Sequence, residues 1–283
     1  MSRPRDIDYL LEEVVTLPSL PRTVTHITQL VSDPNCSLAM VAKAVSSDPA
    51  IALKTLRLVN SAFYGLRQQV ATVEHAVVLL GMKVIRNLVF TATVFDTLKS
   101  GVDTLLKHSV SCGVAMRVLV ERGKNIPVEY VEEAFIYGLL HDIGMILFEQ
   151  FLPREHALVS AACSARKIPR YQAEREIIGV DHAMVGMRLA HKWRLPDNIV
   201  HVIAGHHELD QCANAAMKPV SATLAIADYV CTACGLSSYE DSVVRVEEQV
   251  WESAGFSNEE IPGILEAFFE AFPSIEELVK LTL

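Results

Sequence analysis

Apolar residues recur along most of the chain at the spacing of one face of an α-helix. Two stretches show the i, i+3, i+4, i+7 pattern clearly: Ile7, Leu10, Leu11 and Val14, and Val73, Ala76, Val77 and Leu80. The sequence contains no convincing β-hairpin pattern and no glycine-rich phosphate loop. The pattern therefore predicts an all-α fold, a bundle of many helices.

Several short motifs indicate where helices begin. Asp48 precedes Pro49, which is the order of an N-cap residue and a proline at the first helical position. Two further pairs have the spacing of a capping box, Ser257 with Glu260 and Ser274 with Glu277. We expect a helix to begin at each of these three places.

The helical pattern divides into three regions. Residues 1–103 form an N-terminal helical layer that includes the sequence LPSLP at positions 17–21, and residues 104–236 contain eight of the ten histidines. Residues 237–283 form a C-terminal helical appendix. Because no flexible linker separates the three regions, we expect them to form one compact body.

The charge of the chain is concentrated in the appendix. Residues 238–283 hold eleven acidic and two basic residues, so this segment carries the whole net charge of −9. It also contains many large apolar residues, among them Trp251, Phe256 and Phe268, which a disordered acidic tail would lack. We therefore expect folded helices with a negative outer face, able to attract a basic partner surface. Nucleic acid is not expected as a partner, since Lys54, Arg57 and Arg67 do not form a basic footprint.

Membrane, export and disulfide signals are weak. Apolar runs such as residues 76–82 are too short to cross a bilayer, and the N-terminus lacks the apolar segment of a signal peptide. The six cysteines show no disulfide-framework spacing, and Cys231 and Cys234 form a CxxC pair without the second pair of a zinc ribbon. These features predict a cytoplasmic protein, not bound to a membrane, with reduced cysteines.

Seven polar residues fall on, or directly beside, the apolar faces of helices in the central region. They are His108, His141, Asp142, His182, His206, His207 and Asp228. His108, for example, shares a face with Cys112, Ala115 and Leu119. Burying a carboxylate without a partner is costly. We therefore expect these side chains to surround one buried polar site between helices.

Imidazole and carboxylate groups are the usual ligands of zinc, iron and manganese. The seven residues are therefore candidate metal ligands for one or two divalent ions, with Asp142 as a candidate bridge. We expect nitrogen and oxygen ligands and no sulfur, because no cysteine shares the spacing of the site. The alternative is a hydrogen-bonded cluster of histidines and aspartates that no longer holds a metal.

The order of these residues resembles a known signature. His108, His141-Asp142, His182, His206-His207 and Asp228 look like the H…HD…H…HH…D signature of HD-domain phosphohydrolases, in particular the HD-GYP type, and GLLHDIG at 138–144 is close to that family's core motif. The segments at 17–21, 46–66, 73–89 and 181–207 resemble the HDOD domain, the HD-related output domain of bacteria. The resemblance covers about residues 10–235 and implies an HD-like helical fold.

Two positions depart from the HD-GYP pattern. Where those enzymes have a lysine that contacts substrate phosphate, this chain has Met145, and no GYP motif follows His206-His207-Glu208. A thioether cannot neutralise a phosphate oxygen. The HDOD resemblance implies a non-catalytic module of bacterial signal transduction, with signalling proteins as partners and a small nucleotide as a candidate ligand. The alternative is a metal-dependent phosphohydrolase acting on a nucleotide or cyclic dinucleotide.

A polar and aromatic cluster closes the apolar helix that follows Pro49. Asn60, Ser61, Phe63 and Tyr64 precede Gly65, a residue that often ends a helix. The simpler interpretation is a helix end packed on the next layer. The HDOD resemblance favours a partner or inter-layer contact by Asn60, Phe63 and Tyr64. The oligomeric state stays open.

Overall fold

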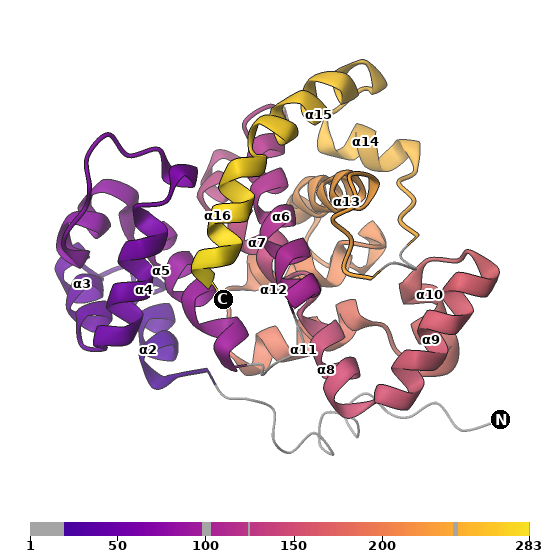
Figure 1. Ribbon diagram of the computed structural model, residues 1–283, viewed down its shortest axis with the longest axis horizontal. Helices are drawn as coiled ribbons and strands as arrows, with labels where there is room; N and C mark the ends of the chain where they lie inside the picture. Colours follow the sequence, from indigo (N-terminus) through magenta and orange to yellow (C-terminus); the bar gives the residue numbers. More distant parts are fainter. Residues whose placement is uncertain (1–19, 98–102, 124, 240–242, 283) are drawn as a thin grey trace.

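The protein is described by a computed structural model that covers residues 20–97, 103–123, 125–239 and 243–282. Within these ranges every regular element is a helix, as Figure 1 shows, so the predicted all-α class is confirmed. The apolar stripe at 7–14 and the first part of the LPSLP sequence lie outside the described residues. Buried apolar side chains form one continuous cluster from Leu20 to Leu278. The division at residues 103 and 236 stays a prediction.

The N-terminal helices gather at one end of the molecule, shown in indigo and purple in Figure 1. They are α2 (Arg22–Val31), α3 (Leu38–Ser46), α4 (Pro49–Val59), the 3₁₀ turn η1 (Ala62–Tyr64) and α5 (Val73–Thr97). The Asp48 side chain accepts hydrogen bonds from the backbone N–H groups of Ala50 and Ile51, at 3.1 and 3.2 Å, which confirms the predicted cap of α4. Gly81 interrupts α5 with a φ of 80°, a backbone conformation that favours glycine.

The central helices carry the candidate site. They are α6 (Asp103–Val120), η2 (Val128–Glu133), α7 (Ala134–Leu140), α8 (Ile143–Phe151), α9 (Pro153–Arg166), α10 (Arg170–Ile177), α11 (His182–Lys192), α12 (Asp197–Gly205), η3 (Leu209–Gln211), η4 (Ala215–Met217) and α13 (Lys218–Ala233). Helix α6 packs against α7 and α13, while α11 packs against α8 and α12.

Two glycines of the GLLHDIG segment allow helices to approach closely. A Cβ atom on Gly138 would lie 2.3 Å from the backbone carbon of Cys112, in α6. A Cβ atom on Gly144 would lie 2.0 Å from the carbonyl oxygen of His182, at the start of α11. Because either position would clash with backbone, glycine at both sites brings α6 and α11 against the turn that holds His141 and Asp142.

The appendix folds onto the body, as predicted. Its elements are α14 (Glu248–Ala254), η5 (Asn258–Glu260), α15 (Ile261–Glu270) and α16 (Phe272–Thr282). Helix α14 packs on α13, α15 packs on α6, and α16 packs on α6, α4 and η1. Trp251, Phe256 and Phe268 are buried, whereas Phe269 is exposed. The exposed acidic side chains include Glu247, Glu248, Glu252, Glu259, Glu266, Glu270 and Glu276.

One of the two predicted capping boxes in the appendix is wrong. The Ser257 N–H donates to Glu260 Oε2 at 2.8 Å, which is one of the two bonds of a capping box, and the 3₁₀ turn η5 follows Ser257 before α15 begins at Ile261. Ser274, in contrast, lies inside α16, which begins two residues earlier at Phe272. Its expected partner Glu277 instead accepts a hydrogen bond from the backbone N–H of Ala62, at 2.8 Å. This contact ties α16 to η1 of the N-terminal layer.

Among the described residues, one helix is long and apolar enough to cross a membrane by length and composition. It is the segment Val73–Val94, and a second candidate arises if two segments that meet at 119° are counted as one span. The most apolar window of Val73–Val94 is 61% buried inside the protein. Gly81 also breaks the helix within this segment. Much of this apolar surface is therefore already covered by the protein's own core.

Candidate metal centre

The helices of the central region and the turns between them bring all seven predicted site residues together. His108 lies within α6 and Asp228 within α13. The other five lie at helix ends: His141 ends α7, Asp142 precedes α8, His182 begins α11, and His206 and His207 follow α12. All except the half-buried His207 are buried. The helix ends thus contribute polar side chains to the cluster, whereas the middle parts of the helices are mostly apolar.

The carboxylate of Asp142 is the centre of the cluster. Its Oδ1 lies 3.3 Å from His141 Nε2, 3.2 Å from His182 Nε2 and 3.7 Å from His206 Nε2. Its Oδ2 lies 3.4 Å from His108 Nε2 and accepts a hydrogen bond of 2.8 Å from the Ser238 hydroxyl. A single carboxylate is therefore surrounded by four imidazole nitrogens.

The other nitrogen of each of these four rings is already engaged. Nδ1 donates to a backbone carbonyl in three of them: His108 to Leu236 at 2.6 Å, His141 to Gly138 at 2.7 Å and His206 to Ile203 at 2.6 Å. His182 Nδ1 lies 2.6 Å from a carboxylate oxygen of Glu174. Because these partners accept hydrogen bonds, the proton of each neutral ring sits on Nδ1, and the lone pair of Nε2 faces the centre.

In this arrangement the lone pairs of neighbouring Nε2 atoms point toward one another. Nε2 of His108 lies 3.3 Å from Nε2 of His141, although both Nδ1 atoms hold the ring protons. The buried Nε2 of His206 has no hydrogen-bond partner. Facing lone pairs repel, and a buried acceptor without a partner is costly. An extra proton, a cation or a donating water molecule at the centre would relieve this repulsion.

Burial and the neighbouring charges shift the pKa values of the cluster residues in different directions. Burial would raise the pKa of Asp142, but His141 and His182 hold that pKa well below its usual value. Burial would lower the pKa of His182, but Glu174 and Asp142 outweigh it and raise the pKa well above its usual value. Burial, together with the neighbouring His141 and His182, keeps the pKa of His206 well below its usual value. The surroundings thus favour the ionised form of Asp142, the protonated form of His182 and the neutral form of His206.

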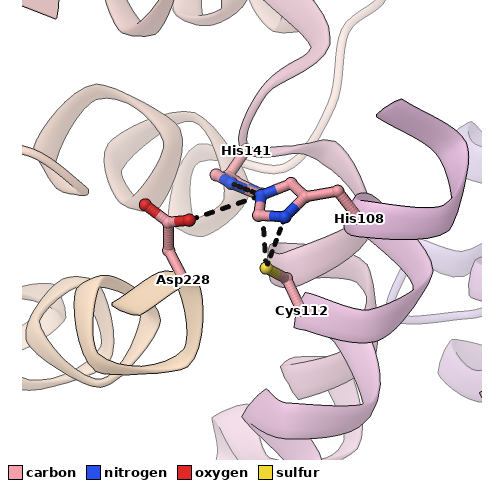
Figure 2. Close-up of side chains that lie close together, drawn as sticks. All are labelled: His108, Cys112, His141 and Asp228. Atoms are coloured by element: carbon pink, nitrogen blue, oxygen red, sulfur yellow. Dashed lines mark hydrogen bonds and ion pairs between the residues drawn. The ribbon is translucent and has the colours of Figure 1, made fainter. Parts of the chain in front are cut away.

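The donor atoms form two groups that fit a divalent metal. His108, Cys112, His141 and Asp228 form one group, shown in Figure 2, and Asp142, His182, His206 and His207 form the other. Within each group one donor atom of every residue lies within 4.8 Å of the rest. Nitrogen, carboxylate oxygen and sulfur suit zinc and iron, and the fixed Nδ1 bonds orient the rings as metal-binding histidines require.

The expectation of nitrogen and oxygen ligands without sulfur stays a prediction. Its premise that no cysteine shares the spacing of the site does not hold, because Cys112 Sγ lies 3.4 Å from His108 Nε2. The reason is helix geometry, since residues four apart in α6 share one face. Burial and a hydrogen bond with Cys231 raise the pKa of the Cys112 thiol well above its usual value. The i, i+4 spacing from His108 was the signal that pointed to it.

Two further residues of the site had no signal in the sequence. Glu174 accepts from both the backbone N–H and Nδ1 of His182, at 2.9 and 2.6 Å, and is buried in α10. Ser238 contacts Asp142 from the loop after α13. Neither has a spacing from the seven predicted residues that helical periodicity would reveal.

A small cavity leads from the cluster toward the surface. Asp142, His182, His206 and Asp228 line it, together with Met145 and other residues, and its volume is about 50 Å³. Such a volume holds about three or four water molecules, since each needs roughly 10–15 Å³. The centre therefore has room for ions and water in this conformation.

The predicted contact residues lie in the N-terminal layer and are not part of the cluster. Asn60 binds within its own layer, with its side chain bonded to both the N–H and the carbonyl of Val70, at 2.7 and 2.9 Å. Phe63 and Tyr64 reach the central region, where the Arg117 guanidinium of α6 lies 4.8 and 5.7 Å from their ring centres. Phe63 and Tyr64 are thus inter-layer contacts, whereas Asn60 closes a loop.

Comparisons with known proteins match the chain over most of its length. The model of the HDOD domain matches residues 17–209. An uncharacterized protein of Treponema pallidum (strain Nichols) is 26% identical over 222 residues, which is 77% of this chain and 43% of that protein. The chain thus spans less than half the length of this curated relative.

The solved structures that are similar to this one include three bacterial proteins. A proposed phosphohydrolase of Shewanella amazonensis SB2B is 25% identical, with a TM-score of 0.76 and coverage of 97% of this chain and 98% of that one. An HDOD domain protein of unknown function from Geobacter sulfurreducens is 24% identical, with a TM-score of 0.77 over 98% and 99% of the two chains. A proposed signal transduction protein of Marinobacter aquaeolei VT8 is 22% identical, with a TM-score of 0.77 over 96% and 61%. The last two likenesses concern the fold alone.

Proposed function

The chain belongs to the HDOD domain family, and from this premise we propose that it is a regulatory module of bacterial signal transduction and not a hydrolase. In this proposal the buried histidines and aspartates hold a divalent metal, iron, zinc or manganese, as one or two ions. The metal stabilises the fold and the binding surfaces, and signalling proteins are the partners.

The size of the central cavity is the observation that carries this proposal. Its volume of about 50 Å³ suits ions and a few waters. A nucleotide or cyclic dinucleotide needs a pocket of roughly 300 Å³ or more. A substrate of that kind could reach the cluster only if the cavity widened, and the cavity wall includes residues 243–246 before α14 as well as helices.

The chemistry of the cavity wall supports the same proposal. Met145 lines the cavity and is buried. It occupies the position at which the HD-GYP enzymes that this chain resembles have a lysine. Arg170 also lines the cavity, but its guanidinium stacks 4.0 Å from the ring centre of Tyr239 and bonds to the Ser160 hydroxyl at 2.9 Å. The Arg170 guanidinium is thus engaged with α9 and with the loop after α13, and a second arginine, Arg245, lines the same cavity.

A metal-dependent phosphohydrolase is the second candidate, favoured by the complete set of seven donor residues. A bound divalent ion would lower the pKa of a water ligand and polarise a phosphoryl group. The chain's own part would be to orient the rings through their Nδ1 bonds and to keep Asp142 ionised. This candidate requires a substrate smaller than a nucleotide, or an opening of the cavity.

Further parts of the proposal concern location and partners. We propose a cytoplasmic protein whose exposed acidic appendix attracts a basic surface of a partner protein, with a small nucleotide as a candidate ligand. The negative charge of this face would raise encounter rates, and less so at high salt. Nucleic acid and membrane remain outside the proposal.

Metal analysis paired with an activity screen tests the proposal. The protein is purified without chelators, its metal content is measured, and it is assayed with cyclic dinucleotides and generic phosphodiesters beside an Asp142→Asn variant. We expect bound metal in the native chain, a lower content in the variant and no turnover by either protein. Turnover by the native chain that the variant loses would favour the phosphohydrolase. A metal content under about a tenth of an equivalent would favour a cluster balanced by protons alone.

A further inference from the structure

We infer that a second buried polar network couples the N-terminal layer to the metal centre by fixing α7 and α12, the two helices that lead into the cluster from one side. This Arg86 network consists of Arg86 of α5, Glu133 of η2, Tyr137 of α7 and Asn198 of α12. The inference rests on the proposed metal site and assigns it positioning residues that lie outside the cluster.

Hydrogen bonds join the four residues without a gap. The Arg86 guanidinium donates to Glu133 Oε1 at 2.6 Å. The other carboxylate oxygen, Glu133 Oε2, accepts from the Tyr137 hydroxyl at 3.1 Å and from the Asn198 side-chain amide. Asn198 also donates to the Tyr137 hydroxyl oxygen, at 2.7 Å. Arg86, Glu133 and Tyr137 are buried, where hydrogen bonds between polar groups are stronger than in water.

The network holds one end of two short helices whose other ends reach the cluster. Glu133 directly precedes α7, which is seven residues long and is followed by His141. Asn198 is the second residue of α12, which is nine residues long and is followed by His206. At about 1.5 Å per residue these helices are only roughly 10 and 14 Å long. A shift at the network end of either helix therefore moves the imidazole at its other end.

The two helices also meet at both ends. At the network they are joined by the bond between Tyr137 and Asn198, and at the cluster the ring centres of His141 and His206 lie 5.1 Å apart. Nε2 of these two rings lies 3.3 and 3.7 Å from Oδ1 of Asp142. The placement of α7 against α12 thus determines how two candidate ligands approach the same carboxylate.

Arg86 connects this pair of helices to the N-terminal layer, because α5 packs against α2, α3 and α4. Its neighbour Asn87 accepts from the same guanidinium at 3.2 Å and donates to the carbonyl of Glu132 at 3.3 Å. A buried ion pair is not required merely to hold two layers together, since apolar residues often do so at least as well. The directional bonds to Glu133 instead favour one placement of α5 relative to α7 and α12.

Metal affinities of variants test the coupling. The native full chain is titrated with zinc, iron(II) and manganese(II), and the ion that binds most tightly is then used with Arg86→Gln, Tyr137→Phe and the double variant. Urea unfolding of the metal-free proteins measures stability. We expect each single variant to lose about two- to thirtyfold in metal affinity. The double variant should lose less than the product of the two losses, because both act through Glu133.

Glu277→Ala is the matched control. It removes the bond from the Ala62 N–H to Glu277 at 2.8 Å, which ties the N-terminal layer to α16 and not to α7 or α12. We expect this variant to lose stability in urea and to keep the native metal affinity. Arg86→Lys keeps a positive charge beside Glu133, so it should retain more metal affinity than Arg86→Gln.

Each outcome decides a separate claim. If the network variants are less stable but bind metal as the native chain does, the network is purely structural and the inference fails. A double variant that loses the full product contradicts a single network. If the native chain binds none of the three ions, the proposed metal site fails, and imidazole NMR signals of the metal-free chain decide the inference. The signals of His141 and His206 should then shift in Tyr137→Phe and not in Glu277→Ala, and unchanged signals in both would overturn it. Tyr137→Phe removes a single oxygen atom, so the test stands even if Arg86→Gln does not fold.

Discussion

The imidazole rings of the cluster are oriented before any ligand arrives. Three Nδ1 atoms donate to backbone carbonyls, which stay in place whatever side chain the accepting residue carries. His182 differs, because a side chain, Glu174, holds its Nδ1. The orientation of His182 is therefore the one that a single substitution can change.

Replacing Glu174 by glutamine tests that dependence. Glu174→Gln keeps the shape but removes the charge that holds the His182 proton, so we expect metal affinity to fall about 10–100-fold and the fold to lose about 1–3 kcal/mol. Metal titration and urea unfolding measure the two effects. Glu176→Gln, in the same helix, is the matched control, since Glu176 is exposed and pairs only with Arg166 among the contacts described. Equal metal affinity in both variants would contradict a positioning role for Glu174.

At this scale the sequence predicted the members of the cluster better than their supports. His108 and Asp228 share faces with apolar residues, so their inward direction could be inferred from periodicity. Glu174 precedes His182 by eight residues and belongs to another helix, so its approach depends on how α10 folds back onto α11. Cys112 lies on the same face of α6 as His108. The sequence did not distinguish it from the core cysteines, because a cysteine at that spacing is equally typical of an apolar helix face.

At the scale of the elements, the closeness of helices determines the site. The turn between α7 and α8 lies between α6 and α11 because Gly138 and Gly144 carry no Cβ. Both contacts are to backbone atoms, which cannot move aside as a flexible side chain can.

An alanine at Gly144 tests this packing. Its Cβ would lie 2.0 Å from the carbonyl oxygen of His182, so we expect Gly144→Ala to destabilise the fold by about 3 kcal/mol or more and to lower its metal content. Gly263→Ala is the control, because Gly263 lies in α15 with no atom within 4 Å of the added Cβ, and alanine there should be neutral or stabilising by up to about 1 kcal/mol. Urea unfolding measures both. Equal stability of the two variants would show that α8 and α11 can separate at no cost.

The helical character of the chain was easier to predict than the residues at which its helices begin. Asp48 has a proline after it and no competing start, and the structure confirms its cap. Ser274 has a suitable acid three residues later, but α16 already begins at Phe272, directly after α15 ends. A motif of four residues does not show how close the end of the preceding helix lies. It also does not show that Glu277 accepts a hydrogen bond from a backbone N–H of another layer.

At the scale of the whole molecule, the appendix combines two properties. Its inner side buries aromatic residues against the body, and its outer side displays acidic ones. The first property concerns stability and the second concerns partners, so they can be separated by different changes.

Deleting residues 247–283 removes both properties but leaves Ser238 and its bond to Asp142 in place. We expect the melting temperature to fall by roughly 10 °C or more, or the protein to aggregate, because several large apolar contacts worth about 1.5–3 kcal/mol each are lost. Circular dichroism and soluble yield measure this.

The control keeps the packing and changes the charge. Glu266→Gln together with Glu270→Gln alters two exposed acids of α15, so the melting temperature should stay unchanged while binding to a basic partner surface weakens at low salt. A truncated chain that melts like the native one would show that the appendix contributes little to the fold.

The bond between Glu277 and Ala62 joins residues 215 positions apart. During synthesis, η1 leaves the ribosome long before its partner, and at about 5–20 residues per second the wait is roughly 10–40 seconds. Through that interval the N-terminal layer must rely on its own small core or on a chaperone, since α16 does not yet exist to cover it. An unfinished chain that stops short of α16 would therefore display the uncovered side of α4 and η1, a surface that cellular quality control could recognise.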